Sequence, residues 1–354
     1  MPTIFDPITV GALSLPNRII MAPLTRSRAT AGTHTPVPIM AEYYAQRASA
    51  GLIISEATVV DRMGVGYEAT PGIWSDEQVE GWKTVTRAVH DSGGRIVLQL
   101  WHVGRISDPS LLDGKSPLSA SAIAAKGHVS LLRPERPYPV PRALDTGEIP
   151  GIIAAYRQGA VNAKGAGFDG VEIHGANGYL LDQFLQDSTN QRTDAYGGSR
   201  EKRARLMLEV TDAVVEVWGA DRVGMHLAPR ADAHDMGDSD RLATFTYLAR
   251  ELGKRRLAFI CAREATLEDS IGPRLRDAFG GVYIANENFT RESAEEALAD
   301  GAADAVAFGK AFIANSDLVA RFSAKAPLNS CDDQTFFGGG AKGYLDYPTL
   351  SPLI

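Results

Sequence analysis

The sequence predicts an α/β fold, a (β/α)8 TIM barrel with a long lid loop after its third strand. Eight short runs are almost continuously apolar, as parallel strands buried on both faces should be. Segments with helical spacing of apolar residues separate most of these runs. Eight strand–helix units in a chain of 354 residues are typical of a closed barrel, whereas a doubly wound sheet normally has fewer strands per domain. We therefore expect one domain over residues 1–354.

The expected strands follow one another along the chain. They are "RIIMAP" (18–23), "LIISEA" (52–57), "RIVLQLW" (95–101), "GVEIH" (170–174), "VGMHLA" (223–228), "LAFICA" (257–262), "GVYIAN" (281–286) and "DAVAFG" (304–309). Helices are expected at 76–92, 146–165, 199–218, 240–252 and 290–300. Thr290 opens the last of these as an N-cap, because its hydroxyl can accept a hydrogen bond from a free backbone N–H of the first turn.

The connection from Val103 to Leu144 is too long for an ordinary turn. It is rich in proline and has little periodicity. A loop of this length in a compact domain is usually functional, and loops that follow barrel strands lie on the active-site face. We expect a lid over the site, and the alternative is a plain surface excursion.

Composition excludes several classes of function. The net charge of -7 and the pI of about 5.6 do not favour nucleic-acid binding. No apolar run approaches the roughly 20 residues that cross a bilayer, and the first residues do not resemble a signal peptide. The cysteines Cys261 and Cys331 form no CxxC pair, so we expect a cytoplasmic protein without a disulfide scaffold. The histidines lack HxH, HxxxH and HExxH spacings, so no metal site is indicated.

Polar and small residues gather where the expected strands end. In a barrel the chemistry collects at the carboxyl ends of the strands. Residues at or just beyond these ends are Pro23, Leu24, Thr25, Ala57, Gln99, Trp101, His174, Asn177, His226, Asn286, Gly309 and Lys310.

Gly309 and Lys310 follow the eighth strand, where barrels often bind a phosphate. Gly309 would let the backbone approach closely, and Lys310 would supply a cation. The alternative is a packing glycine beside a solvated lysine, and the local sequence favours neither.

His174 and Asn177 can both donate hydrogen bonds. Two donors that converge on one oxygen would polarise a carbonyl or nitro group, and Tyr179 could then supply a proton. Taken alone, a single histidine is more often a structural residue.

Longer motifs carry a resemblance to a known family. They are "FDPITVGALSLPNRIIMAPLTR" (5–26), "QLWHVGR" (99–105), "HGANGYLLDQFL" (174–185), "NQRTDAYGGS" (190–199), "DAVAFGKAFIAN" (304–315) and "FFGGGAKGYLDYP" (336–348). In this order and over the whole chain they resemble the old yellow enzyme family, in particular its bacterial branch of enoate and nitrate-ester reductases.

The resemblance implies an FMN-dependent ene-reductase with NAD(P)H as co-substrate. By this resemblance the flavin site comprises Pro23, Leu24, Thr25, Ala57, Gln99, His226, Asn286, Gly309 and Lys310. The substrate site comprises His174, Asn177, Tyr67, Trp101 and Tyr344, and the catalytic residues are His174, Asn177 and Tyr179. Thr25 is implied to contact the flavin C4 carbonyl, and Gly309 and Lys310 to hold the phosphate.

A ping-pong cycle follows from the same resemblance. NAD(P)H reduces FMN, and hydride then passes from flavin N5 to the β-carbon of an α,β-unsaturated carbonyl or a nitroalkene. Nitrate esters are a further substrate class of the same branch. His174 and Asn177 would bind the substrate's oxygen, and Tyr179 would protonate the α-carbon. The expected partner is a small-molecule, electron-poor alkene, and no binding to nucleic acid or to a membrane is expected. The chain is expected to be a monomer or a homodimer.

One departure from the family bears on chemistry. Where the family has arginine beside flavin N1 and O2, this chain has His226 in "MHLAP" (225–229). Histidine can be uncharged near neutrality, so we expect a weaker flavin oxidant unless Arg230 replaces the charge. The rival hypothesis is a barrel that binds a phosphorylated ligand, with weakened flavin affinity and no redox activity. Dienoyl and trimethylamine-type relatives carry iron–sulfur cysteines that this sequence lacks.

Overall fold

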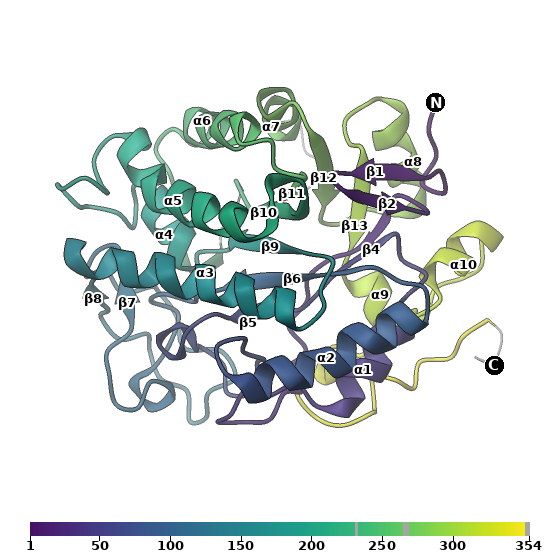
Figure 1. The fold of residues 1–354 in the computed structure, drawn as a ribbon, viewed down its shortest axis with the longest axis horizontal. Coiled ribbons are helices and arrows are strands. Elements are labelled where there is room, and N and C mark those ends of the chain that lie inside the picture. The colour runs from purple at the N-terminus through teal and green to yellow at the C-terminus, as the bar shows by residue number, and fades with distance from the viewer. Residues whose placement is uncertain (231–232, 265–268, 351–354) are drawn as a thin grey trace.

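Eight parallel strands close into a barrel in the computed structural model, which describes residues 1–230, 233–264 and 269–350 (Figure 1). The strands are β3 (Ile19–Met21), β4 (Leu52–Ile54), β6 (Ile96–Trp101), β9 (Gly170–Gly175), β10 (Val223–Leu227), β11 (Phe259–Arg263), β12 (Val282–Asn286) and β13 (Ala305–Phe308). Neighbours in the barrel are also neighbours in this order, and β13 pairs with β3 to close the ring. The predicted barrel and its eight strands are confirmed.

Helices surround the barrel where the sequence predicts them. The five expected helices are α2 (Asp76–Asp91), α3 (Ile149–Gly165), α5 (Arg200–Trp218), α6 (Arg241–Lys254) and α8 (Arg291–Ala299). Further helices are α1 (Pro38–Ala45), α4 (Leu180–Leu185), α7 (Gly272–Phe279), α9 (Lys310–Ala314) and α10 (Leu318–Ala324). A 3-10 turn at Thr146–Glu148 explains why α3 begins later than expected. The Thr290 hydroxyl accepts from the Ser293 N–H, which confirms the predicted N-cap.

A small hairpin closes the amino end of the barrel. It consists of β1 (Ile8–Val10) and β2 (Leu13–Leu15), whose apolar side chains join the cluster inside the barrel. Gly11 turns the hairpin at φ 56°, and a Cβ there would lie 2.0 Å from the carbonyl oxygen of Asp221, just before β10. Among the described residues these apolar side chains fill the amino end of the barrel.

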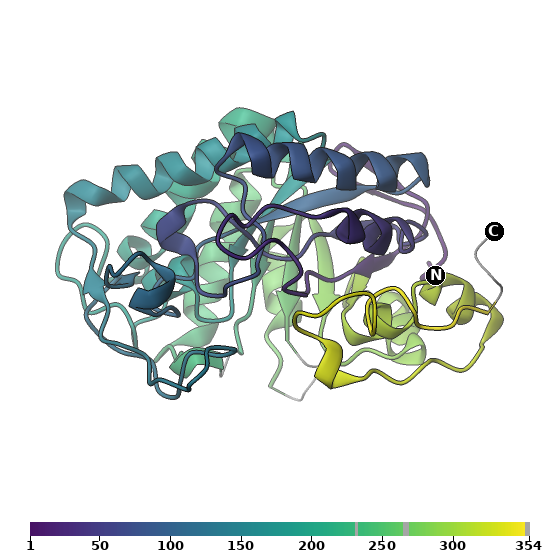
Figure 2. The same ribbon diagram turned by 90° about the horizontal axis from the view of Figure 1, so that it is seen from below.

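The long connection after β6 folds over the carboxyl end of the barrel. It includes β7 (Leu118–Ser119), β8 (Arg142–Ala143) and a short turn at Pro109–Leu111. Its apolar side chains pack on Trp101 at the end of β6. Figure 2 shows this connection (blue to teal) and the C-terminal segment (yellow) along the same edge of the molecule. The predicted lid loop is therefore present.

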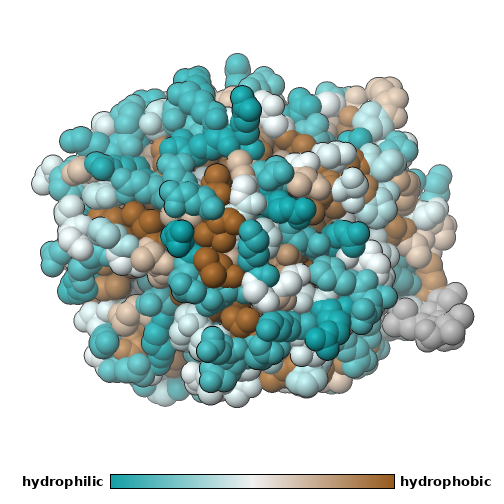
Figure 3. Space-filling view, in the orientation of Figure 1, coloured by the Kyte–Doolittle hydropathy of each residue, from teal (hydrophilic) through white to brown (hydrophobic). Residues whose placement is uncertain are grey.

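None of the helices in the described part of the chain is long and apolar enough to span a bilayer. On the face in Figure 3 hydrophilic residues prevail, and apolar residues stand in small groups between them. Scattered apolar groups of this kind are ordinary on globular proteins.

Candidate functional site

A pocket of about 480 Å³ opens at the carboxyl ends of the strands. All nine residues expected to hold the flavin line it, namely Pro23, Leu24, Thr25, Ala57, Gln99, His226, Asn286, Gly309 and Lys310. Trp101, His174, Asn177 and Tyr179 line it as well. The barrel brings them together because parallel strands end at one edge, although these residues span most of the sequence.

An outer cavity of about 430 Å³ adjoins the first. The two share Pro23, Leu24, Thr25, Tyr179 and Lys310. The outer walls come from Tyr67, from Ser130 and Leu131 of the lid loop, and from Ile313, Phe336 and Phe337. The lid loop and the C-terminal segment thus form a mostly apolar entrance to the inner pocket.

His174 is a neutral hydrogen-bond donor in the pocket wall. Burial, with His226 nearby, lowers the pKa of His174 well below its usual value. Its Nδ1 accepts a hydrogen bond from the Ala176 N–H at 3.3 Å, so the ring proton resides on Nε2. His174 therefore offers an N–H to a ligand in the pocket without carrying a charge.

Asn177 lies in the turn between β9 and α4, at φ 56°. Asparagine tolerates this left-handed conformation better than most residues. Its backbone carbonyl accepts from His234 Nδ1 at 2.7 Å, and its side-chain Oδ1 accepts from Arg263 Nη1 at 2.9 Å. Asn177 is thus fixed at the pocket wall, its backbone by His234 and its carboxamide by Arg263.

Tyr179 presents a protonated hydroxyl at the junction of the two cavities. Burial raises the pKa of Tyr179 to about 12. Its hydroxyl lies 3.1 Å from the hydroxyl of Tyr67. Trp101 packs edge-on against the Tyr179 ring with centroids 4.9 Å apart, and lies nearly parallel to the Tyr67 ring at 5.7 Å. The aromatic contacts fix a group that can donate a proton at neutral pH.

A buried carboxylate underlies one end of the pocket. Glu172 Oε2 accepts from Gln99 Nε2 at 2.7 Å, and Glu172 Oε1 lies 3.6 Å from His226 Nδ1. The last two atoms are buried and lack a hydrogen-bond partner among the described residues. Cys261 on β11 is the neighbour of His226 on β10. Burial, together with the nearby Glu172, raises the pKa of the Cys261 thiol well above its usual value.

The opposite end of the pocket is formed after β12 and β13. Gly309 immediately precedes α9, and Lys310 is its first residue. Asn286 ends β12, and its Nδ2 donates to the Ala307 carbonyl at 3.0 Å, which fixes the amide across the two strands. The backbone N–H groups at a helix start lack intrahelical acceptors. Together with the Lys310 cation they suit a phosphate group.

Tyr344 does not form a wall of either cavity, contrary to expectation. It is fully buried, and its ring stacks on Tyr43 at 4.0 Å with an interplanar angle of 1°. The guanidinium of Arg28 lies 4.1 Å from the Tyr344 centroid and that of Arg26 at 5.0 Å. These cation–π contacts draw the ring behind the pocket, and Phe336 and Phe337 of the same segment reach the outer cavity instead.

Arg263 and Glu287 line the pocket but were not among the expected site residues. Arg263 follows "LAFICA" directly, at the carboxyl end of β11. A charged residue at the end of a barrel strand was the signal that could have identified it. Arg230 is engaged elsewhere, since its guanidinium contacts Asp269 at 2.6 and 2.8 Å.

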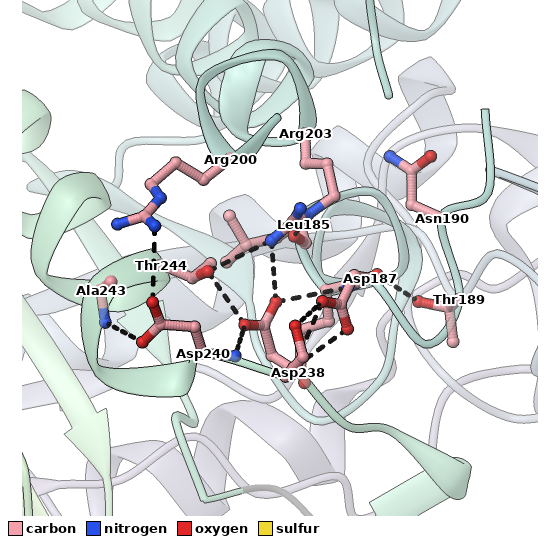
Figure 4. Close-up of polar contacts among 12 residues, drawn as sticks. Leu185, Asp187, Thr189, Asn190, Arg200, Arg203, Asp238, Asp240, Ala243 and Thr244 are labelled. Atoms are coloured by element: carbon pink, nitrogen blue, oxygen red, sulfur yellow. Dashed lines mark hydrogen bonds and ion pairs between the residues drawn. The ribbon is translucent and has the colours of Figure 1, made fainter. Parts of the chain in front are cut away.

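A polar network joins α5 to the loops around Asp187 and Asp238 (Figure 4). Arg203 on α5 donates to the Leu185 carbonyl at 2.8 Å, to Asp238 at 3.1 Å and to Thr244 at 3.2 Å. Asp238 also accepts from the Asp187 N–H at 3.3 Å. This network ties the chain after α4 to the chain that carries His234, which holds the Asn177 backbone.

Known proteins are similar to this chain over nearly its whole length. Residues 3–329 match the model of the NADH:flavin oxidoreductase / NADH oxidase family. A probable flavin mononucleotide-dependent alkene reductase of Leishmania infantum is 44% identical, with 97% of this chain and 96% of that protein covered. The 12-oxophytodienoate reductase 1 of Oryza sativa subsp. japonica is 43% identical, with 99% and 94% covered.

Solved structures are similar over the same length. Morphinone reductase in complex with tetrahydroNAD superposes with a TM-score of 0.96 at 49% identity, with 99% of each chain covered. The old yellow enzyme homologue from Zymomonas mobilis also has a TM-score of 0.96, at 46% identity, with 99% of this chain and 100% of that chain covered. The chain therefore belongs to the NADH:flavin oxidoreductase / NADH oxidase family, that of the old yellow enzyme, and is an FMN-dependent oxidoreductase that uses NAD(P)H.

Proposed function

We propose that the protein is an ene-reductase that saturates electron-poor alkenes. The alkene substrates are α,β-unsaturated carbonyls and nitroalkenes. Nitrate esters, which have no C=C bond, are a further class: one hydride would convert the ester to its alcohol and nitrite. The observation that carries this proposal is the convergence of two neutral N–H donors and one protonated hydroxyl, those of His174, Asn177 and Tyr179, in the pocket that the flavin residues line. These groups can polarise an alkene-conjugated oxygen and protonate the adjacent carbon.

The pocket fits FMN in size and in its donor set. Its volume of about 480 Å³ lies within the roughly 300–1,000 Å³ of small-molecule sites. Lys310 and the backbone after Gly309 suit the phosphate, while Thr25, Gln99 and His226 suit the polar edge of the ring. When bound, FMN accepts hydride from NAD(P)H and returns hydride to the alkene. Because one pocket serves both reactions, we expect ping-pong kinetics.

In the reduction of the alkene, the chain's own residues determine which carbon accepts the hydride and which accepts the proton. His174 Nε2–H and the Asn177 amide bind the substrate oxygen and draw electron density toward it, which makes the β-carbon electron-poor. Tyr179 then gives its proton to the α-carbon. The outer cavity, with Leu131, Phe336 and Phe337, shields the substrate from water.

The purified protein is expected to be yellow and to release FMN on denaturation. The absorbance spectrum and the mass of the released compound measure this directly. A colourless protein that takes up no added FMN would overturn the proposal and would favour the rival, a barrel that binds a phosphorylated ligand without redox chemistry. Membership of a flavin oxidoreductase family argues against that rival.

His226→Arg is expected to raise the reduction potential of the bound flavin by about 30–60 mV. A permanent guanidinium charge favours the negatively charged reduced flavin more than an imidazole does. A hydrogen bond to a charged group contributes roughly 1.5–3 kcal/mol, and about 1.4 kcal/mol corresponds to roughly 30 mV for a two-electron couple. Potentiometric titration at pH 8 measures the shift.

Arg230→Gln is the matched control for this experiment. Arg230 is ion-paired with Asp269 and does not line the pocket, so its loss should leave the potential unchanged. A potential that stays constant or falls in His226→Arg, with flavin still bound, would contradict the assigned role of position 226. A fall in potential in Arg230→Gln would instead assign the charge to Arg230.

A further inference from the structure

The guanidinium of Arg263 connects two residues of the pocket wall. Its Nη1 donates to Asn177 Oδ1 at 2.9 Å. Its Nε and Nη2 donate to Glu287 Oε1 at 3.1 and 2.8 Å. Arg263 ends β11, Asn177 follows β9 and Glu287 follows β12, so the contacts join three strand ends around the pocket.

This contact determines which way the Asn177 amide faces. A guanidinium has only donors and no acceptor. The amide must therefore turn its oxygen toward Arg263, which leaves Nδ2 on the other side. Among the described residues Nδ2 has no hydrogen-bond partner, and Asn177 lines the pocket. An N–H donor is thus available to a ligand there, whereas a flipped amide would offer an acceptor and repel a substrate oxygen.

Glu287 holds Arg263 in this position. The two side chains form an ion pair at 2.8 Å, and each is at most about one-third exposed. Glu287 has φ 96° and the next residue, Asn288, has φ 60°. Asparagine tolerates a positive φ, but for Glu287 it is costly, and such strain persists where the surroundings hold it, often at functional sites. The strained turn places the Glu287 carboxylate against the guanidinium.

We propose that Arg263 is a positioning residue of the oxygen-binding site: it orients the Asn177 amide so that Nδ2 faces the substrate and, by donating to Oδ1, strengthens Nδ2 as a donor. Hydrogen bonds in a chain polarise one another, and a charged donor acts more strongly than a neutral one. The inference rests on the proposed function, because it assigns Asn177 to the substrate oxygen. The inference adds Arg263 as the residue that keeps the Asn177 amide in the orientation needed to bind that oxygen.

A double-mutant cycle tests whether Arg263 acts through Asn177. The probe is 4-chlorophenol, whose phenolate oxygen would occupy the oxygen site of the FMN-loaded protein, and its Kd is measured from the long-wavelength charge-transfer band. Arg263→Gln is expected to weaken binding about tenfold, or about 1.4 kcal/mol. In the Asn177→Ala background the same change should have no further effect, since the amide is gone.

Two results would overturn the proposal. One is an Arg263→Gln variant that binds the phenol as tightly as the unmodified protein. The other is an equal weakening in both backgrounds, which would mean that Arg263 touches the ligand itself. If the unmodified protein binds no FMN, or no phenol, the proposed function fails instead, and this outcome is visible before any variant is compared.

If the Arg263→Gln variant does not retain FMN, two more conservative variants can be used for the same binding measurement. Arg263→Lys retains the charge but lacks the fork that spans Asn177 and Glu287, so it should recover only part of the affinity. Glu287→Gln leaves Arg263 and Asn177 in place and removes the ion pair, and a loss of about threefold that vanishes in Asn177→Ala is expected. If Glu287→Gln instead weakens binding equally in both backgrounds, the relay through Asn177 is wrong.

Discussion

Tyr179→Phe is expected to slow the reduction of enones by about 10²–10⁴-fold, the usual contribution of a general acid. The change removes only the hydroxyl, and the ring contacts with Trp101 can remain. Reduction of the flavin by NAD(P)H needs no proton from Tyr179 and should stay near normal. Stopped-flow measurement of the two half-reactions separates these effects.

The pH profile and a control variant sharpen this prediction. Because burial raises the pKa of Tyr179 to about 12, the rate should fall only as the pH approaches that value. Tyr67→Phe removes the neighbouring hydroxyl but keeps that of Tyr179, so a much smaller loss is expected. Nitroalkenes should be less affected by Tyr179→Phe, since water can protonate their reduced anion. An equal loss in both half-reactions would show that Tyr179 is not the proton donor.

Replacing His174 and Asn177 together by alanine is expected to abolish phenol binding over the flavin. Each donor's hydrogen bond to a charged oxygen contributes roughly 1.5–3 kcal/mol, so losing both should weaken binding by about 10²–10⁴-fold. The broad charge-transfer band of the phenolate complex should disappear at ordinary phenol concentrations. Absorbance titration of the variant, with its FMN content checked first, gives the result.

The single variants provide the control for this experiment. His174→Ala and Asn177→Ala should each lose part of the affinity, because each leaves one donor in place. A band that persists unchanged in the double variant would place the oxygen site elsewhere in the pocket. A loss of FMN in the double variant would show that these residues also support the cofactor site, and the single variants would then carry the comparison.

The strand-end residues of the inner pocket could be predicted from the sequence because barrel geometry links strand ends to one pocket. Thr25, Gln99 and Lys310 lie far apart in sequence, yet each stands at or just beyond a strand, and a closed parallel barrel puts all such positions at one edge. The expected helices could likewise be predicted from the spacing of their apolar residues.

Helix α1 could not be predicted in this way. Residues are buried around much of its circumference, such as Met40 and Tyr43, so the sequence shows no clear apolar face.

The remaining features depend on partners that are distant in sequence. Tyr344 was expected in the pocket wall, but its place is set by stacking on Tyr43 and by the guanidinium of Arg28. Arg263 was missed although it ends an expected strand, since its role depends on contacts with Asn177 and Glu287 that no local pattern records. The periodicity of apolar residues therefore does not predict which side chains pair across the barrel.

The first and last parts of the chain meet at the pocket, and this affects how the protein can be made. Arg26, just beyond the first barrel strand, donates to the carbonyls of Phe336 and Gly343, and Phe336 and Phe337 line the outer cavity. During translation these residues emerge long after Arg26, so Arg26 has no acceptors in that segment until all the barrel strands have been made. A premature stop shortly before residue 336 would leave the barrel strands intact but the entrance incomplete. The buried Arg26 would then lack its acceptors at Phe336 and Gly343 but keep the Tyr43 hydroxyl.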